Sequence, residues 1–165
     1  MGLFSKIKNY ITGGAASVSV VFESPMVDGS TPIRLFVTAI AKDDCKIKKV
    51  YLNIRARETY IKTVTYTETD GDGNSRTSTR DETRYEDHFQ KEMVLATDLE
   101  LKKGAEDKWL AEFELPEDAK ATYHGKSVFF KWEFQAGLDM PGNDPDSGWV
   151  ELLVSKAMNY TMNDL

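Results

Sequence analysis

The sequence predicts an all-β protein built as a two-sheet antiparallel β-sandwich of about seven to nine strands. The first observation is a strict alternation of apolar and polar residues in three runs between positions 108 and 154. This period of two is typical of strands with one buried and one wet face. The second observation is that bulky aromatic residues, including Trp109, Phe130 and Trp132, fall on the repeating face. A core that thick needs a second sheet to cover it.

The composition limits the classes of function. The chain has 165 residues, of which 41% are hydrophobic and 29% charged, so we expect one domain with its own core. The net charge of −6 argues against a nucleic-acid-binding surface, which usually needs a basic face. The single cysteine, Cys45, excludes a disulfide framework within one chain and favours the cytoplasm. We interpret Cys45 as an unreactive thiol, because no histidine or acid lies at a telling spacing from it.

Residues 1–14 predict a short amphipathic N-terminal helix that ends at a pair of glycines. The residues on its apolar face are Leu3, Phe4, Ile7, Tyr10 and Ile11. Such a helix can anchor a protein to a membrane surface or to a partner. We favour the interpretation that it lies on the domain or on a sister subunit, because ten residues bury little surface and only two lysines flank them.

The next strands follow from the same alternation. The first runs over residues 16–23, the second over 33–41 and the third over 50–56. Their predicted inward residues are Val18, Val20, Phe22, Ile33, Leu35, Val37, Ala39, Ala41, Val50, Leu52, Ile54 and Ala56. Further along, residues 97–107 predict a polar connection with a turn at 102–104, and residues 156–165 predict a flexible tail. Residues 15–155 would then form the single sandwich domain.

Between positions 59 and 90 the sequence is rich in threonine, tyrosine and charge, with two Asp-Gly steps near its middle. Thr and Tyr favour strands and Asp-Gly favours a turn, so we expect a long hairpin that is largely exposed to solvent. Its candidate contact residues are Tyr60, Tyr66, Arg80, Arg84 and Tyr85. The hairpin is either an interaction arm or a ribbon whose charges prevent edge-to-edge aggregation. The sequence leaves both interpretations open.

Two acidic segments resemble cation sites only weakly. Asp70, Asp72 and Asn74 match the first positions of an EF-hand loop, but Ser75 replaces the required glycine and no helices flank the segment. The acids of residues 139–146 fit ordinary turn chemistry better. The two histidines, His88 and His124, lie on different segments. We therefore predict no metal site, no cofactor and no catalytic residue.

Several steps of the sequence resemble an arrestin-type domain. They are the Leu115-Pro116 step, the turn at Tyr123-His124-Gly125, the strand over 128–136 and the loop that begins Leu138-Asp139-Met140-Pro141-Gly142. Residues 4–7, the Gly-Gly and residues 47–54 resemble the opening of the bacterial sporulation-control branch of arrestin-like proteins. The family usually has two such sandwiches, whereas this chain has room for one. Residues 39–44 also replace the glycine-rich second strand of the family.

The resemblance implies an arrestin-like (immunoglobulin-like) sandwich that acts as a non-enzymatic, cytoplasmic regulatory adaptor and binds other proteins. One alternative is a structural protein that assembles with copies of itself, and another is a module bound to a membrane surface. A third is a carbohydrate-binding sandwich that uses Trp149 as a stacking platform. The sequence leaves open who the partner is, whether helix or hairpin binds it, and whether another chain supplies a second domain.

Overall fold

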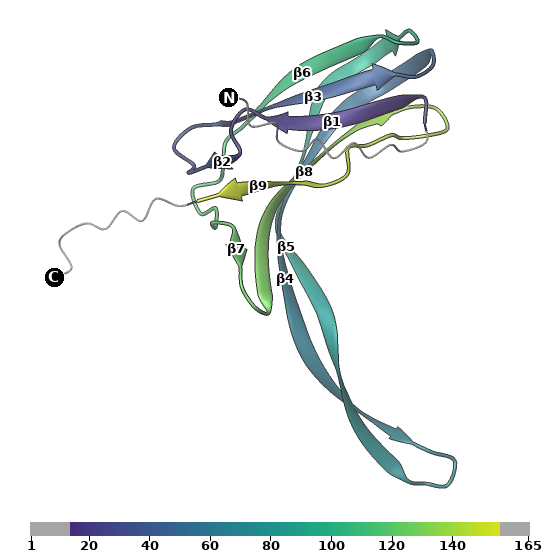
Figure 1. Ribbon diagram of the computed structural model, residues 1–165, viewed down its shortest axis with the longest axis vertical. Coiled ribbons are helices and arrows are strands. Elements are labelled where there is room, and N and C mark those ends of the chain that lie inside the picture. The colour runs from purple at the N-terminus through teal and green to yellow at the C-terminus, as the bar shows by residue number, and fades with distance from the viewer. Residues whose placement is uncertain (1–13, 156–165) are drawn as a thin grey trace, which may run out of the picture.

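The computed structural model describes residues 14–155, which form strands and connecting turns arranged as two sheets (Figure 1). The smaller sheet has the order β1-β3-β6, with β1 Ala16–Phe22, β3 Ile33–Ala41 and β6 Glu106–Phe113. The larger sheet has the order β2-β9-β8-β4-β5, with β7 beside β8. Its strands are β2 Met26–Val27, β9 Val150–Val154, β8 Val128–Asp139, β4 Cys45–Thr69, β5 Ser75–Leu101 and β7 Tyr123–His124.

This arrangement confirms the all-β, two-sheet class that the alternation predicts. The predicted N-terminal helix, with Leu3, Phe4, Ile7, Tyr10 and Ile11, lies outside the residues that the structure describes. Within residues 14–155, no helix has the length and hydropathy needed to cross a membrane.

The core lies between the two sheets, where the predicted inward residues meet. Trp132 and Phe134 on β8 are 1% and 0% exposed. The Trp132 ring contacts Phe113 from the smaller sheet, with centroids 6.4 Å apart, and Phe89 from β5, at 5.6 Å. The Trp132 indole N–H also donates to the carbonyl of Lys120 at 2.9 Å, so burial leaves no unpaired donor there.

Strands β4 and β5 are far longer than the sandwich needs, with 25 and 27 residues. Strand β4 pairs with β8 from Lys49 to Tyr60, and beyond that it pairs only with β5 until the turn after Thr69. We call residues 61–83 the arm. Figure 1 shows it as a twisted two-stranded ribbon that projects away from the sandwich. The long exposed hairpin predicted from the Asp-Gly steps is therefore present.

One prediction about the connections is wrong. The sequence predicts a polar connection over 97–107, but β5 continues to Leu101 and only residues 102–105 turn the chain into β6. Leu99 and Leu101 pair with Ile47 and Cys45 on β4, and Leu101 is buried. Asp98 takes a φ of 52°, a conformation that aspartate tolerates better than most residues. Pairing with β4 thus overrides the polar composition of this segment.

Candidate functional site

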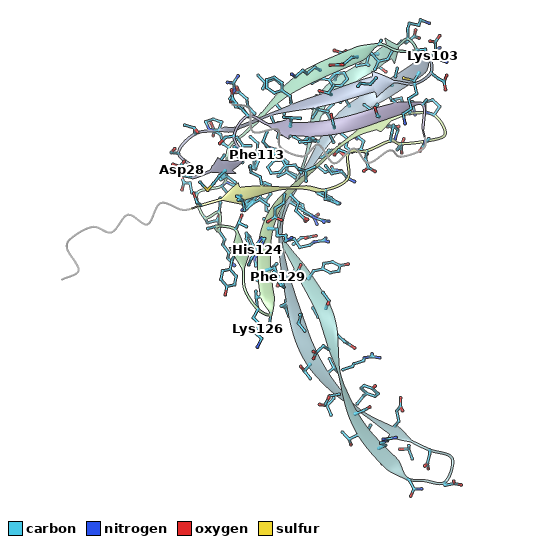
Figure 2. All side chains as sticks on the ribbon, viewed as in Figure 1. Asp28, Lys103, Phe113, His124, Lys126 and Phe129 are labelled. Carbon is cyan, nitrogen blue, oxygen red and sulfur yellow. The ribbon has the colours of Figure 1, made fainter. Side chains whose placement is uncertain are left out.

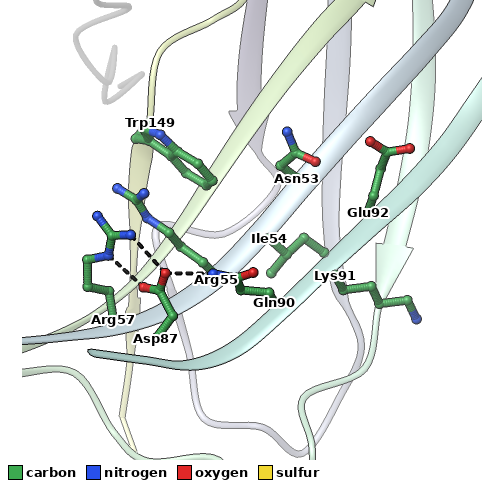
Figure 3. Close-up of a pocket in the computed structure, with 9 residues that line it drawn as sticks. All are labelled: Asn53, Ile54, Arg55, Arg57, Asp87, Gln90, Lys91, Glu92 and Trp149. Atoms are coloured by element: carbon green, nitrogen blue, oxygen red, sulfur yellow. Dashed lines mark hydrogen bonds and ion pairs between the residues drawn. The ribbon is translucent and has the colours of Figure 1, made fainter. Parts of the chain in front are cut away.

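The base of the arm carries a network of charged and aromatic side chains on the outer face of the larger sheet. Arg55 and Arg57 alternate with the core residues Ile54 and Ala56, so both point away from the core. Figure 3 shows the two guanidinium groups side by side, with Trp149 above them and Asp87 across on β5. Although this face is wet, the two arginine side chains are only 16% and 23% exposed.

Arg57 and Asp87 form a two-point ion pair across β4 and β5. The Arg57 Nε and a terminal guanidinium nitrogen donate to the two Asp87 carboxylate oxygens at 2.6 and 2.8 Å. Gln90 also donates to Asp87, at 2.6 Å. The hydrogen bonds from Arg57 hold the pKa of Asp87 below its ordinary value, and the Asp87 carboxylate raises the pKa of Arg57. The pair is therefore charged at neutral pH.

Arg55 is held by one carboxylate and one aromatic ring. Its Nε donates to Glu133 on β8 at 2.8 Å, and its guanidinium carbon lies 3.7 Å from the centroid of the Trp149 ring. Such a cation–π contact contributes about 0.5–2 kcal/mol, depending on solvent exposure. Because Arg55 covers one face of the indole, Trp149 does not present that face to a sugar.

Two shallow hollows flank these arginines. One has a volume of about 350 Å³ and lies between β5 and Trp149; the other, of about 410 Å³, lies between β4 and β8 near Phe129 and Lys131. Arg55 and Arg57 line both hollows. Since each arginine already has a carboxylate partner, the surface presents donors and acceptors together and suits a polar partner of mixed charge.

The two faces of the arm differ in chemistry. The register pairs Tyr60 with Arg84 and Val64 with Arg80, so these residues share one face with Tyr66. The opposite face carries Tyr85 with a series of hydroxyl side chains, namely Thr59, Thr63, Thr65, Thr67, Thr69, Ser75, Thr77, Thr79 and Thr83. The structure thus brings four of the predicted contact residues together and places Tyr85 on the other face.

Tyr85 connects the arm to the arginine network. The Arg57 guanidinium lies over its ring at 4.3 Å, yet Tyr85 is 66% exposed. The hydroxyl-rich face of the arm therefore continues into the surface around Arg55, Arg57 and Trp149. We call this continuous track, from Trp149 through Tyr85 to the arm, the outer track.

On the opposite face, Glu82 lies between the two predicted arginines. Arg80 and Arg84 donate to its carboxylate oxygens at 2.8 and 2.7 Å, and these bonds lower the pKa of Glu82. The Arg80 guanidinium also lies 5.2 Å from the Tyr66 ring centroid. Exposed ion pairs of this kind contribute little to folding stability. Both arginines keep further N–H donors that a partner can bind while Glu82 stays in place.

The acidic turns use their carboxylates to hold the backbone. Asp70 accepts the N–H groups of Asp72 and Asn74 at 3.1 and 2.8 Å, and Asp144 accepts the N–H of Met140 at 3.0 Å. Across residues 14–155, no group of three or more acids, histidines or cysteines is placed to hold a metal ion.

The cysteine and the two histidines lie on three different strands, β4, β5 and β7. His124 contacts Glu151 at 2.7 Å, and His88 lies 3.8 Å from Glu58. Cys45 is buried, and burial raises the pKa of its thiol, which makes it less reactive.

The predicted contact residues did not include Arg55, Arg57 or Asp87. The available signal was the presence of two arginines on the wet side of an otherwise alternating strand. Their partners Asp87 and Glu133 lie 30 and 78 residues away, so only the strand register identifies them.

Comparison with known proteins places the fold. No protein-family model and no curated protein matches the sequence. Among solved structures, the chain is similar to Spo0M, a sporulation control protein from Bacillus subtilis, with a TM-score of 0.61 and 18% identity. The match covers 87% of this chain but 51% of that one, so this chain spans about half the length of Spo0M. The predicted resemblance to the sporulation-control branch of arrestin-like proteins is confirmed at the level of the fold.

Proposed function

We propose that this chain is a non-enzymatic regulatory module that binds another protein through the arm and the outer track. The likeness to Spo0M supports a regulatory fold, since that protein is described as a sporulation control protein. The net charge of −6 favours a protein partner over a nucleic acid, because nucleic-acid-binding proteins usually carry a basic surface. We place the protein in the cytoplasm, because its single cysteine is buried and free and a reducing compartment keeps thiols in that form. We also propose residues 15–155 as one domain.

The observation that carries this proposal is the arm itself. From residue 61 to residue 83 no side chain is buried, so the arm adds nothing to the core. An isolated two-stranded ribbon is only marginally stable in water, and this one is held in place by strands anchored in the sandwich. A long ribbon presented by a rigid body is well suited to recognition.

Tyr85 is the residue of the outer track that we expect to contribute most to binding. Exposed tyrosines with a neighbouring arginine are typical anchors of protein interfaces, because the ring supplies a large contact area and the hydroxyl a hydrogen bond. Tyr85 and Arg57 form such a pair at the base of the arm. Thr83 and Asp81 extend the same face toward the tip.

The proposal is tested by capture from a lysate with two variants. In the first, Asn-Gly replaces residues 63–81 and joins the register partners Lys62 and Glu82 by a two-residue turn. In the second, Tyr85→Ala removes the proposed anchor. The matched control is Tyr123→Ala, which removes an exposed tyrosine on β7, outside the outer track.

We expect one defined protein to bind the wild type and the Tyr123→Ala control, and to be lost with both the shortened arm and Tyr85→Ala. Equal recovery by wild type and the shortened arm would contradict the proposal. All four proteins should unfold cooperatively with thermal midpoints within about 5 °C of each other, which separates lost binding from lost folding.

A further inference from the structure

The two edges of the arm are not equally protected. Strand β8 stops pairing with β4 at Tyr60, and the last backbone bond runs from the Ile61 N–H to the Ser127 carbonyl at 2.9 Å. Beyond that bond, β4 has no neighbour on this side among residues 14–155. Figure 2 shows the outer part of the arm standing clear of the sandwich, past the turn that carries Lys126.

The free edge of β4 lacks the features that usually discourage strand pairing. Its stretch Thr63-Val64-Thr65-Tyr66-Thr67 has five residues of high strand propensity, with no charge, proline or glycine. The β5 residues that pair with this stretch, 77–81, include two charges, Arg80 and Asp81. The flanking charges are Lys62 and Glu68 on β4, and Arg76, Glu82 and Arg84 on β5. Charges on an edge strand oppose pairing with another chain. The β4 edge is therefore the one open to an added strand.

The backbone of this edge is already oriented for pairing. Because the Ile61 N–H points toward β8, the alternation of an antiparallel ladder points the N–H and C=O groups of Thr63, Thr65 and Thr67 the same way. These groups lie past the end of β8, and no strand of residues 14–155 pairs with them on that side.

We propose that a second copy of this chain pairs antiparallel with the β4 edge, about a two-fold axis that passes through Thr65. In this register Lys62 lies opposite Glu68 of the second copy, and Val64 lies opposite its Tyr66. Thr63 lies opposite Thr67, and Thr65 opposite itself. Each unlike pair occurs twice, as the symmetry of such an interface requires. The result is a four-stranded sheet with β5 at both outer edges.

The side chains favour this register over its neighbours. A shift by one residue would place the two chemically different faces of the arm on the same side. A shift by two in one direction places Lys62 opposite Tyr66, and in the other direction it places Val64 opposite Glu68. Only the register centred on Thr65 matches opposite charges with each other and an apolar residue with an aromatic one, the kinds of cross-strand pair that stabilise sheets.

This inference concerns the same arm as the proposed function but does not depend on it. Pairing through β4 leaves the β5 edge and both faces of the arm exposed, including Tyr85. The test uses the purified full chain alone, so its outcome does not depend on whether another protein binds.

The register is tested by cysteine crosslinking. Opposed Cα atoms in a hydrogen-bonded antiparallel pair lie about 5.5 Å apart, which a disulfide can span. Cys45 is the single cysteine and is buried, so it gives little background. We expect Thr65→Cys to form a covalent dimer under mild oxidation. Thr67→Cys alone should remain monomeric on a non-reducing gel, whereas a mixture of Thr63→Cys and Thr67→Cys proteins should crosslink to each other.

The charge pairs give an independent test by sedimentation equilibrium. Lys62→Glu places like charges opposite each other twice per dimer, so we expect roughly a ten-fold weaker dimer. Glu68→Lys should weaken it similarly, and the double exchange should restore it.

Equal crosslinking of Thr65→Cys and Thr67→Cys alone would overturn the register. A wild type that stays monomeric at every concentration would overturn the pairing itself, and the lysate capture experiment would be unaffected.

Discussion

The inner and outer halves of β4 are parts of one strand with opposite roles. In the inner half, Val50, Leu52, Ile54 and Ala56 are at most 1% exposed and β8 pairs along one side. In the outer half, past Tyr60, no residue is buried and β5 is the sole neighbour within the described chain. The pairing with β5 continues through both halves, with register shifts at Val50/Tyr51 and Ala56/Arg57. Backbone pairing is thus shared, and the difference lies in the side chains.

This difference shows that a strand can continue well beyond the core that stabilises its first part. The inner half is stabilised by apolar burial between two sheets, which is the dominant favourable contribution to folding. The outer half has only cross-strand side-chain pairs, each worth about 0.2–1 kcal/mol. The sandwich should therefore be insensitive to changes in the arm, while the arm depends on the sandwich for its anchorage.

The largest effect is expected in the core. Trp132→Ala should lower the free energy of unfolding by about 3–5 kcal/mol, because it leaves a cavity and removes the donor to the Lys120 carbonyl. Chemical denaturation measures this loss. Tyr66→Ala, which removes an arm aromatic, is the contrasting variant and should cost less than about 1 kcal/mol. If Trp132→Ala and Tyr66→Ala lowered the free energy of unfolding by similar amounts, the distinction between core and arm would be wrong.

The next largest effect is expected where the two halves meet. Asp87→Ala leaves the partly buried Arg57 without its carboxylate and should destabilise the fold by about 2 kcal/mol. The control is Asp81→Ala, since Asp81 accepts a hydrogen bond from Thr63 on the exposed arm. Asp81→Ala should change the free energy of unfolding by no more than about 0.5 kcal/mol in the same denaturation measurement. A larger effect from Asp81 than from Asp87 would contradict this view of the junction.

The junction should also show a specific pH dependence. The pKa of Asp87 lies below its ordinary value of 3.8 in the folded chain, so its ion pair contributes stability that is fully present above that value. The contribution is lost as the pH falls through the folded-state pKa. The stability difference between wild type and Asp87→Asn should therefore shrink on acidification from about pH 5 to below pH 3. A difference that stays constant over this range would show that Asp87 is not the titrating group.

The smallest effect is expected from removing most of the arm. Replacing residues 63–81 with Asn-Gly should change the free energy of unfolding of the sandwich by no more than about 0.5 kcal/mol, since no buried side chain is lost. Denaturation of the shortened protein, followed by the fluorescence of the three tryptophans, which all lie outside the arm, gives the comparison. A large loss of stability would show that the arm supports the sandwich.

The sequence was most informative where side chains alternate. The inward residues of β3, from Ile33 to Ala41, repeat at every second position and are all buried. The arm was predictable for another reason, because Thr and Tyr favour strands and Asp-Gly favours turns without any tertiary contact. Both signals are local, and local signals survive in a single sequence.

What the sequence did not reveal depends on register. Arg55 pairs with Glu133 and Arg57 with Asp87 only because β4 lies between β8 and β5 with a shift at Ala56/Arg57. The end of β5 was missed for a related reason, since Leu101 is fixed by its place opposite Cys45. A polar stretch carries no local sign of such a partner.

The continuity of β4 from core to tip has a mechanical consequence. A pull on the tip along the arm acts parallel to β4, while the hydrogen bonds that hold β4 to β8 lie across the strands. The ladder from Lys49 to Tyr60 is then loaded in shear, so its bonds share the force and must fail together instead of one after another. The sandwich can therefore serve as an anchor under tension for whatever holds the tip of the arm.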